Sequence, residues 1–393
     1  MITLRLLILR KRFRWTSMLS TPSTPSIPSI PRIASIAIPI LLALAGLALV
    51  PGTLSAQQLP IGVSVDAADR RVVVTAGGQP FTTFIYPDSL EKPVLYPIYA
   101  PDGQLITRGF PVSPRPGEPV DHPHHLGLWF NYEKVNGLDF WNNSYAIPAA
   151  KKSQYGWIHT DSINGHSAAS LPPSNSVMLG RNDLRYKARW TDQQGHVLLD
   201  EATHFFFSAT RDERIIDRIT TLTAVSDGGV SFPDAKDGML GLRVTKELQI
   251  PSNAPGQFVD DKGNITKVAA GNTPDINGNY LTSEGKQGDS AWGTRGTWCL
   301  LYGKKNNDML SIAIIDHPGN PGYPTYWHAR GYGLFAANPL GQSIFSNGRE
   351  TMNFRLAKGQ SATFRYRIVI AAGKDRLSTG RIRQLADAFA HIE

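Results

Sequence analysis

The sequence contains one cysteine, Cys299, among its 393 residues. No disulfide can form within a single chain, so a hydrophobic core has to hold the fold together. The sequence also lacks a glycine-rich phosphate loop, a Gly-x-Ser-x-Gly nucleophile turn and a cysteine pair spaced for a metal ion. These absences argue against a P-loop nucleotide-binding protein, a serine hydrolase of the α/β type and a zinc finger.

Acidic residues are missing from the first 56 positions, which carry six basic residues. An apolar run, Ile33–Val50, follows, and Leu54-Ser55-Ala56 places a small residue before Gln57. This order of regions is typical of a secretory signal peptide. We therefore predict that residues 1–56 are a signal peptide with a disordered leader rich in Pro and Ser, and that the mature chain is periplasmic or extracellular. Two alternatives stay open: a start at Met18 and an uncleaved anchor.

The net charge is +8, and the six basic residues of the leader leave +2 for the rest of the chain. So small a charge gives no reason to expect nucleic acid as a partner. After Ala56 no apolar run is long enough to cross a bilayer. The remaining length suffices for one large domain, and we predict a single domain over residues 57–393.

Short apolar runs separated by turn residues recur from Ile61 to Ala371. Three of them in succession, Leu184–Thr191, Val197–Ser208 and Arg214–Ala224, predict an antiparallel meander. No repeat of about 40 residues indicates a propeller. We predict an all-β fold in which two large antiparallel sheets pack face to face as a supersandwich.

Other segments of the chain give weaker patterns. Only the C-terminus has the spacing of an amphipathic helix, a short one with Ser378 as its N-cap. Met239–Leu248 is predicted as one strand and the polar segment Pro251–Asn279 as a long loop. Glu201 lies within an apolar strand, and we expect it on the side of that strand that faces water.

One stretch holds more titratable side chains than any other: Asp121-His122-Pro123-His124-His125-Leu126-Gly127-Leu128-Trp129-Phe130. If it leads into a strand, His122 and His124 point to one face and His125 to the other. Two imidazoles on one face can share a copper, zinc or iron ion, or bracket a substrate oxygen. A loop whose histidines bond backbone carbonyls is the plain alternative. The sequence requires no cofactor, but His122 and His124 are candidate ligands of a divalent metal.

A second group of polar and aromatic residues lies far downstream, around Asp316-His317 and Trp327-His328-Ala329-Arg330. Strand alternation puts Trp327 on one side and His328 on the other. Lys236 and Arg243 accompany an apolar strand, where a cation needs a partner or a polar cavity. A shared cavity would satisfy all these groups, so we predict one groove that gathers both clusters.

The predicted catalytic residues of this groove are His122, His124, His125, Lys236, Arg243, His317 and His328. The predicted substrate-binding residues, with Trp129 and Trp327 as stacking walls, are Trp129, Asn131, Trp292, Arg295, Asn320, Trp327, Arg330 and Asn338.

The motif His-Pro-His-His-x-Gly-Leu-Trp, within Glu118–Phe130, resembles that of the PmoA-like family of exported bacterial proteins. The resemblance continues through Asp234–Arg243, Trp292–Arg295, Asp316–Asn320 and Trp327–Asn338. That family takes its name from a subunit of a membrane-embedded methane monooxygenase, an activity that the lack of long apolar runs does not support. More distantly, the strand pattern resembles the galactose-mutarotase-like supersandwich. This resemblance implies a site over one sheet, where histidines and a carboxylate or arginine act on a sugar.

These observations favour an exported enzyme that acts on a sugar or glycoside, small or oligomeric, by histidine general acid–base chemistry. One of His124, His317 and His328 would be the acid or base, while Lys236 and Arg243 would stabilise negative charge. Two alternatives stay open: a histidine-ligated metal protein and a non-catalytic carbohydrate-binding module. The sequence does not choose among ring opening, epimerisation, elimination and hydrolysis.

Overall fold

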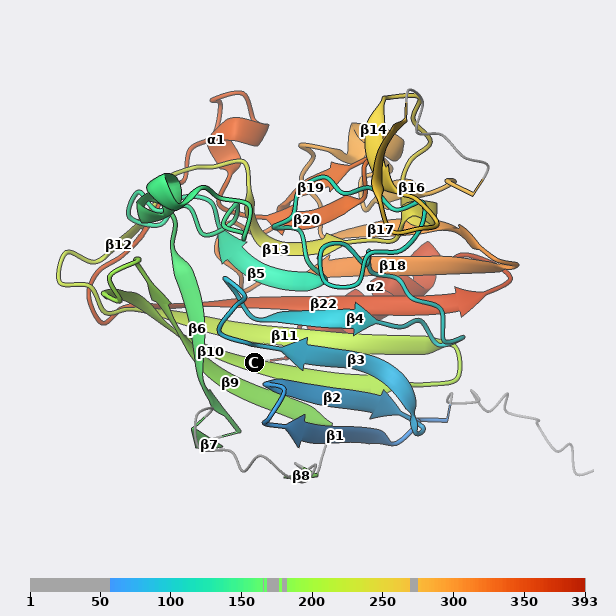
Figure 1. Ribbon diagram of the computed structural model, residues 1–393, viewed down its shortest axis with the longest axis horizontal. Coiled ribbons are helices and arrows are strands. Elements are labelled where there is room, and N and C mark those ends of the chain that lie inside the picture. The colour runs from blue at the N-terminus through green and yellow to red at the C-terminus, as the bar shows by residue number, and fades with distance from the viewer. Residues whose placement is uncertain (1–56, 165, 168–176, 179–181, 269–274, 393) are drawn as a thin grey trace, which may run out of the picture. The chain divides into compact units, whose positions relative to one another are not determined.

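The computed structural model describes residues 57–164, 166–167, 177–178, 182–268 and 275–392 (Figure 1). The signal peptide and leader predicted for residues 1–56 lie outside the described residues. Contacts within the chain group Ser55–Glu393 into one unit. Within the described ranges, no helix is long and apolar enough to cross a membrane.

The first sheet has nine strands among the described residues, in the order β19-β20-β13-β5-β4-β3-β2-β1-β8, and all its pairings are antiparallel. These strands are β1 (Ile61–Asp66), β2 (Arg71–Ala76), β3 (Gln79–Ile85), β4 (Val94–Ile98), β5 (Leu128–Tyr132), β8 (Val177–Met178), β13 (Gly238–Arg243), β19 (Tyr326–Arg330) and β20 (Leu334–Asn338). Because β13 pairs with β5, the strand after the histidine motif lies beside strands from the downstream cluster.

The second sheet also has nine described strands, in the order β16-β17-β18-β22-β11-β10-β9-β6-β7. These strands are β6 (Trp157–Ile163), β7 (His166–Ser167), β9 (Asp183–Thr191), β10 (Val197–Ala209), β11 (Glu213–Ala224), β16 (Asn279–Thr282), β17 (Trp298–Lys305), β18 (Asp308–Asp316) and β22 (Ser361–Gly373). The predicted meander is confirmed as β9, β10 and β11, which pair in succession.

The shorter elements connect and flank the sheets. They are the pair β12 (Val230–Phe232) and β21 (Phe354–Leu356), the hairpin β14 (Gly256–Val259) and β15 (Ile265–Val268), the 3₁₀ turns η1 (Ala149–Gln154), η2 (Lys246–Leu248) and η3 (Gly288–Ala291), and the helix α1 (Gln342–Phe345). Two predictions are corrected here. Segment 251–279 contains a hairpin, and the strand predicted to reach Leu248 ends at Arg243, where the chain turns into η2.

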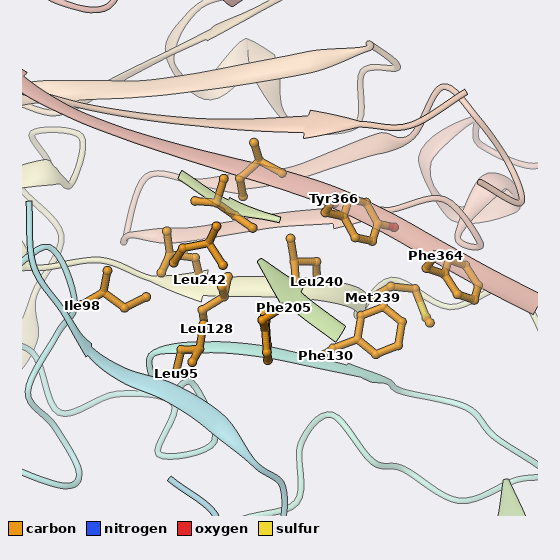
Figure 2. Packing of buried hydrophobic residues seen from close by; sticks show 14 of the residues in the cluster. Leu95, Ile98, Leu128, Phe130, Phe205, Met239, Leu240, Leu242, Phe364 and Tyr366 are labelled. Carbon is orange, nitrogen blue, oxygen red and sulfur yellow. The ribbon is translucent and has the colours of Figure 1, made fainter. Parts of the chain in front are cut away.

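Alternating side chains fill the space between the two sheets. Along β10, Phe205 and Phe207 are buried while their neighbour Phe206 is partly exposed, as a period of two requires. Figure 2 shows Phe130 and Leu240 of the first sheet together with Phe364 of β22 in this core. Complete burial of each such side chain contributes about 1.5–3 kcal/mol. The predicted all-β architecture of two antiparallel sheets is therefore confirmed.

Glu201 lies inside this sandwich and not on the water-facing side where we expected it. Its carboxylate accepts from Trp190 Nε1 at 2.7 Å, from Arg218 Nη2 at 2.8 Å and from the hydroxyls of Tyr186 and Thr203. A buried carboxylate is tolerated only where such partners replace water. Three of the four partners come from β9 and β11, on both sides of β10, and the sequence pattern of β10 alone does not reveal them.

The C-terminal helix α2 (Thr379–Phe389) covers the outer face of the second sheet. Ser378 caps it, because its Oγ accepts from the Arg381 amide at 3.1 Å. Ile382, Leu385 and Phe389 are buried against apolar residues of that sheet. The predicted short terminal helix and its cap are confirmed.

Candidate active site

The histidine motif forms a turn that leads into β5, and the histidines themselves are not part of the strand. His122 has a φ of +45°, and the His125 amide donates to the His122 carbonyl at 3.0 Å. Gly127 has a φ of +57°, and a Cβ there would lie 2.2 Å from the Leu95 carbonyl oxygen. Only glycine fits this approach to β4. The alternation of a strand therefore does not apply to the three histidines.

The three histidine rings gather on the outer side of the first sheet. The rings of His122, His125 and Tyr332 are nearly parallel, with 4.8 Å from the His122 centroid to each of the other two and 6.3 Å between those two. His125 stacks on Trp129 at 5.2 Å, and His124 meets His125 edge-on at 4.3 Å. Trp129 is fully buried, whereas the side chain of His122 is 40% exposed. Trp129 therefore supports the histidines from below, and its predicted role as a wall in contact with substrate is wrong.

Two buried arginines hold the turn in place. Arg108 donates to the backbone carbonyls of Asp121, His122 and His125 at 2.7–3.1 Å. Arg108 and Arg243 both donate to Asp121 Oδ1, at 2.7 and 2.6 Å. Burial alone would raise the pKa of Asp121, but the hydrogen bond with His122 and the two guanidinium groups hold it well below its usual range. Asp121 is therefore a carboxylate at any physiological pH.

The partners of His122 and His125 assign opposite roles to their ring nitrogens. Asp121 Oδ2 lies 2.5 Å from His122 Nδ1, and a carboxylate accepts, so Nδ1 carries the proton. Arg243 Nη1 lies 3.2 Å from His125 Nδ1, and a guanidinium only donates, so Nδ1 accepts and the proton sits on Nε2. Burial, with His124 and Arg243 nearby, keeps the pKa of His125 well below its usual value. The Asp121 contact at Nδ1 thus leaves Nε2 of His122 available to a substrate, while neutral His125 offers an Nε2–H donor.

Lys92 joins this cluster although no sequence pattern indicated it. Its side chain is 5% exposed, its Nζ lies 5.8 Å from the Trp129 ring, and no hydrogen bond or ion pair to it occurs among the described residues. Burial lowers the pKa of Lys92 to about 8, against the opposing effects of Glu91 and Asp139. Burial and the Lys92 charge in turn lower the pKa of His124 to about 2. His124 is therefore a neutral ring beside a cation.

The downstream half of the site is built around Asp237 and His328. His328 Nδ1 lies 3.1 Å from the Lys236 carbonyl and 3.3 Å from Asp237 Oδ1, so Nδ1 carries the proton. Burial and the Lys236 charge lower the pKa of His328 to about 3. Burial raises the pKa of Asp237 to about 6, although Lys236 opposes this. Asn338 fixes the backbone here, because its amide donates to the carbonyls of Ala235 and Lys236.

The two halves of the site lie on the same face of the first sheet. His328, Ala336, Gly241 and Trp129 are neighbours in one row across β19, β20, β13 and β5. Three strand spacings separate the ends of this row, about 14 Å at the backbone. A Cβ on Gly241 would lie 2.5 Å from the Trp129 ring, so glycine is needed for the ring to cross it. Ala336 and Gly241, in the middle of the row, have little or no side chain, so the polar groups of the site lie at its two ends.

Arg330 and two aromatic rings connect these ends. The Arg330 guanidinium lies 5.6 Å from the ring centroid of Trp292 and 5.8 Å from that of Tyr332. Tyr332 stacks on His122, and Trp292 lies 6.5 Å from His328. Trp292 is 36% exposed. The structure thus brings together His122, His124, His125, Lys236, Arg243, His328, Trp292 and Arg330, all of them selected from the sequence.

A family comparison identifies the chain over most of its length. Residues 71–387 match the profile of a family described as "Family of unknown function (DUF6807)". The chain belongs to this family. The match gives no support to the PmoA-like name expected from the sequence. A search of curated proteins finds no match.

Among solved structures, this chain is similar at low identity to several proteins with carbohydrate-related titles. A GH36 α-galactosidase from Geobacillus stearothermophilus has 10% identity and a TM-score of 0.36, covering 80% of this chain and 41% of that one. A putative aldose 1-epimerase from Escherichia coli has 10% identity and a TM-score of 0.31, covering 80% of this chain and 99% of that one. The chain spans about two fifths of the length of the α-galactosidase.

His317 does not join the other histidines, so its predicted place in the groove is wrong. It follows β18 of the second sheet and meets Phe389 of α2 edge-on at 5.2 Å. Asn320 belongs to the same region, where its amide donates to Asp316 Oδ1 and to the Arg365 carbonyl, each at 2.7 Å. Both sheets of the sandwich separate this region from His122. The apolar run that precedes Asp316 showed where a strand ends but not in which sheet it lies.

Other predicted substrate contacts prove to be structural. Trp327 and Asn131 are fully buried, the first in the core between the sheets and the second bonded to the Phe140 carbonyl at 2.6 Å. Asn338 is also fully buried. Arg295 pairs with Glu350 at 2.7 Å and bonds carbonyls of the loop before β19. Trp327, Asn131 and Asn338 are therefore not placed to touch a ligand above the first sheet.

The metal site predicted at His122 and His124 stays a prediction. Within the ranges that the structure describes, no three or more His, Cys, Asp or Glu side chains form a group that could hold a metal ion. The Nδ1 atoms of His122 and His125 already have partners, and Arg108, Arg243 and Lys92 place positive charge beside the rings. This field favours an anion over a metal cation.

Proposed function

We propose that this protein is an exported enzyme that moves protons on a sugar or glycoside bound over the outer face of the first sheet. The observation that supports this proposal best is the Asp121–His122 pair at the exposed end of the ring stack. Its Nδ1–H donates to a carboxylate, which leaves Nε2 to act as a general base. Asp121 would also stabilise an imidazolium formed at His122 during the reaction, as a buried carboxylate does in a Ser-His-Asp triad.

Asp237 is the proposed general acid. Its pKa of about 6 lets it hold a proton in mildly acidic solution, whereas Asp121 stays ionised. Two carboxyl groups whose surroundings push their pKa values apart are a usual sign of divided acid and base roles. Arg330 lies by the Tyr332 ring, and the half-exposed Lys236 lies by Asp237. Both cations would stabilise negative charge on a substrate oxygen.

This arrangement favours proton transfer over displacement by a carboxylate. The oxygens of Asp121 already accept from two guanidinium groups and from His122. A glycosidase that forms a covalent intermediate needs a free carboxylate as nucleophile, and Asp121 is not free. Ring opening, epimerisation or elimination therefore suits these residues better than hydrolysis through a glycosyl intermediate.

A panel of sugars tests the proposal. Aldoses, uronic acids, methyl glycosides and disaccharides would be incubated with the protein in D₂O, with NMR reporting deuterium incorporation and mass spectrometry reporting products. His122→Asn should lower kcat about 10²–10⁴-fold, as loss of a general base does. Asparagine tolerates the positive φ of position 122, so folding should persist. Asp237→Asn should lower the rate by a similar factor.

His196→Gln is the matched control, because the exposed His196 side chain pairs with Asp192 and has no other recorded ion pair among the described residues. It should retain full activity and an unchanged melting temperature. Binding of sugars without any product would contradict an enzyme and favour the binding module. Neither binding nor turnover by any sugar would refute the carbohydrate assignment.

A further inference from the structure

Lys92 is a buried cation that the proposed proton transfer does not use. Its side chain is 5% exposed, and neither a hydrogen bond nor an ion pair to Nζ occurs among the described residues. Its pKa of about 8 keeps the amine mostly protonated at pH 7. A buried charge is costly unless a partner of opposite charge meets it. Lys92 therefore lacks a counter-ion within the part of the chain that the structure describes.

The two carboxylates that act on Lys92 from a distance are engaged with other groups. Glu91 lies 3.5 Å from Lys152 Nζ. Asp139 accepts from the backbone amide and the side-chain amide of Asn142, at 2.9 and 2.8 Å. Both carboxylates raise the pKa of Lys92, but burial lowers it by more. These contacts leave the Lys92 charge uncompensated at short range.

Lys92 lies beside the histidine cluster on the outer side of the first sheet. It precedes β4 by two residues, and β4 adjoins β5 on the side away from β19. Its Nζ lies 5.8 Å from the centroid of the Trp129 ring, on which His125 also stacks. The Lys92 charge is the largest electrostatic influence on the pKa of His124. Lys92 is thus the cation at the β4 end of the site, opposite the end formed by β19.

The Lys92 ammonium group is covered by protein but still touches solvent. Among the described residues, the buried polar atoms without a partner include Trp129 Nε1 and Trp141 Nε1 but not Lys92 Nζ. They also include neither ring nitrogen of His124 and not Nε2 of His125, although these atoms have no hydrogen bond in the described ranges. Solvent therefore reaches polar atoms of all three side chains, and a bound ligand can replace it there.

The charges around the histidine turn favour an anion as that ligand. Arg108 and Arg243 share the carboxylate of Asp121, and Lys92 adds a cation without an ion pair among the described residues. An ammonium group only donates, and so does Nε2–H of neutral His125. A neutral hydroxyl can accept from Lys92 but leaves its charge uncompensated, whereas an anionic oxygen meets both needs.

We propose that Lys92 binds the acidic group of an anionic sugar, a carboxylate or a phosphate ester, beside the histidines. This inference rests on the proposed function, because it names the substrate class of that same site. The preferred substrate is then an acidic sugar, and its neutral counterpart binds more weakly because it leaves Lys92 without a counter-ion.

Matched sugars test this assignment in the wild-type protein. Calorimetric titration with glucuronate, glucose 6-phosphate and glucose, and with the three corresponding galactose compounds, changes only the group at one carbon. An acidic sugar should bind about 10- to 100-fold more tightly than its neutral counterpart, as expected for a hydrogen bond between charged groups. The carboxylate and phosphate compounds show which acidic group the site takes. Equal binding of the neutral hexoses would overturn the proposal.

Lys92→Met should remove the preference for acidic sugars and leave binding of neutral sugars unchanged, because methionine keeps an unbranched side chain without the charge. The melting temperature without sugar should stay the same or rise, because a buried charge without a partner is removed. Lys187→Met is the matched control, because Lys187 is exposed on β9 of the second sheet. It should keep the wild-type preference. A preference that survives in Lys92→Met, or a lower melting temperature that reveals a protein partner of Lys92, would overturn the proposal.

Binding and turnover together separate failure of this subsite from failure of the proposed function. If acidic sugars bind through Lys92 but no sugar exchanges deuterium, the anion subsite stands and the enzyme assignment fails. If sugars exchange deuterium but neutral and acidic ones bind equally, the anion subsite fails and the proposed function stands.

Discussion

Single residues decide what each histidine of the cluster can do. An imidazole next to water can carry its proton on either nitrogen, but the partners here allow one arrangement each. Asp121 can only accept from His122, and Arg243 can only donate to His125. The three histidines and the aspartate before them stand together in the sequence, whereas Arg243 lies 118 positions beyond His125. Their pairing depends on β13 lying beside β5, which local sequence does not reveal.

The titration of Asp237 gives a prediction at this scale. Its pKa is about 6 in the folded protein and 3.8 without the fold, so the folded state binds the proton more readily between these values. The stability that this group contributes is therefore full below pH 3.8 and is lost as pH rises through about 6. Activity should also fall as pH rises through about 6, because the general acid loses its proton.

Asp237→Asn should flatten this part of the stability profile and raise the free energy of unfolding at pH 7. Urea unfolding from pH 4 to pH 8 measures both effects. His196→Gln should keep the wild-type profile. An Asp237→Asn profile that still slopes by the wild-type amount between pH 4 and pH 6 would assign the titration to another group.

At the scale of elements, strands with strict alternation were predictable and segments without it were not. The meander β9–β11 follows from its apolar periods, and α2 follows from Ser378 and a 3.6-residue spacing. The hairpin β14–β15 was missed because all four residues of β15 are exposed, so no apolar face marks it. The directions of the three histidines could not be predicted, because neither the positive φ of His122 nor the contact of Gly127 with β4 leaves a pattern in the sequence.

The network around Glu201 provides a prediction about the central strands. Glu201→Gln removes the charge that faces Arg218 and places an amide donor among donors. Breaking a buried ion pair costs about 3–5 kcal/mol, because the remaining charge stays buried. We expect a loss of about 3 kcal/mol in the free energy of unfolding, measured by urea denaturation.

Glu213→Gln is the control for this prediction. Glu213 pairs with Arg381 of α2 at 2.7 Å, but that arginine side chain is 37% exposed. Pairs of this kind contribute about 0–1 kcal/mol. If Glu201→Gln costs no more than Glu213→Gln, the buried network does not stabilise the sandwich as described.

At the scale of the whole molecule, the sandwich explains which distant residues meet. The first sheet joins β5 to β13, β20 and β19, so residues near positions 122, 237 and 328 share its outer face. His317 is closer in sequence to His328 than His122 is, yet it lies beyond the other sheet, under α2. The order of the strands within the two sheets decides this, and no short motif encodes strand order. Export of the mature chain stays a prediction from residues 1–56.

The most direct test of the account is the position of the ring protons on His122 and His125, observed by long-range ¹H–¹⁵N NMR at pH 7.5. Assignment would come from His122→Asn and His125→Gln spectra. We predict that His122 carries its proton on Nδ1 and His125 on Nε2. In the Arg243→Met variant, only the His125 proton should lose its fixed position. We also predict that the pKa of His125 lies well below its usual value, because the ring is buried beside His124 and Arg243. The same tautomer on both rings, or a His125 that titrates near pH 6.5, would contradict the opposite roles on which the proposed acid–base site rests.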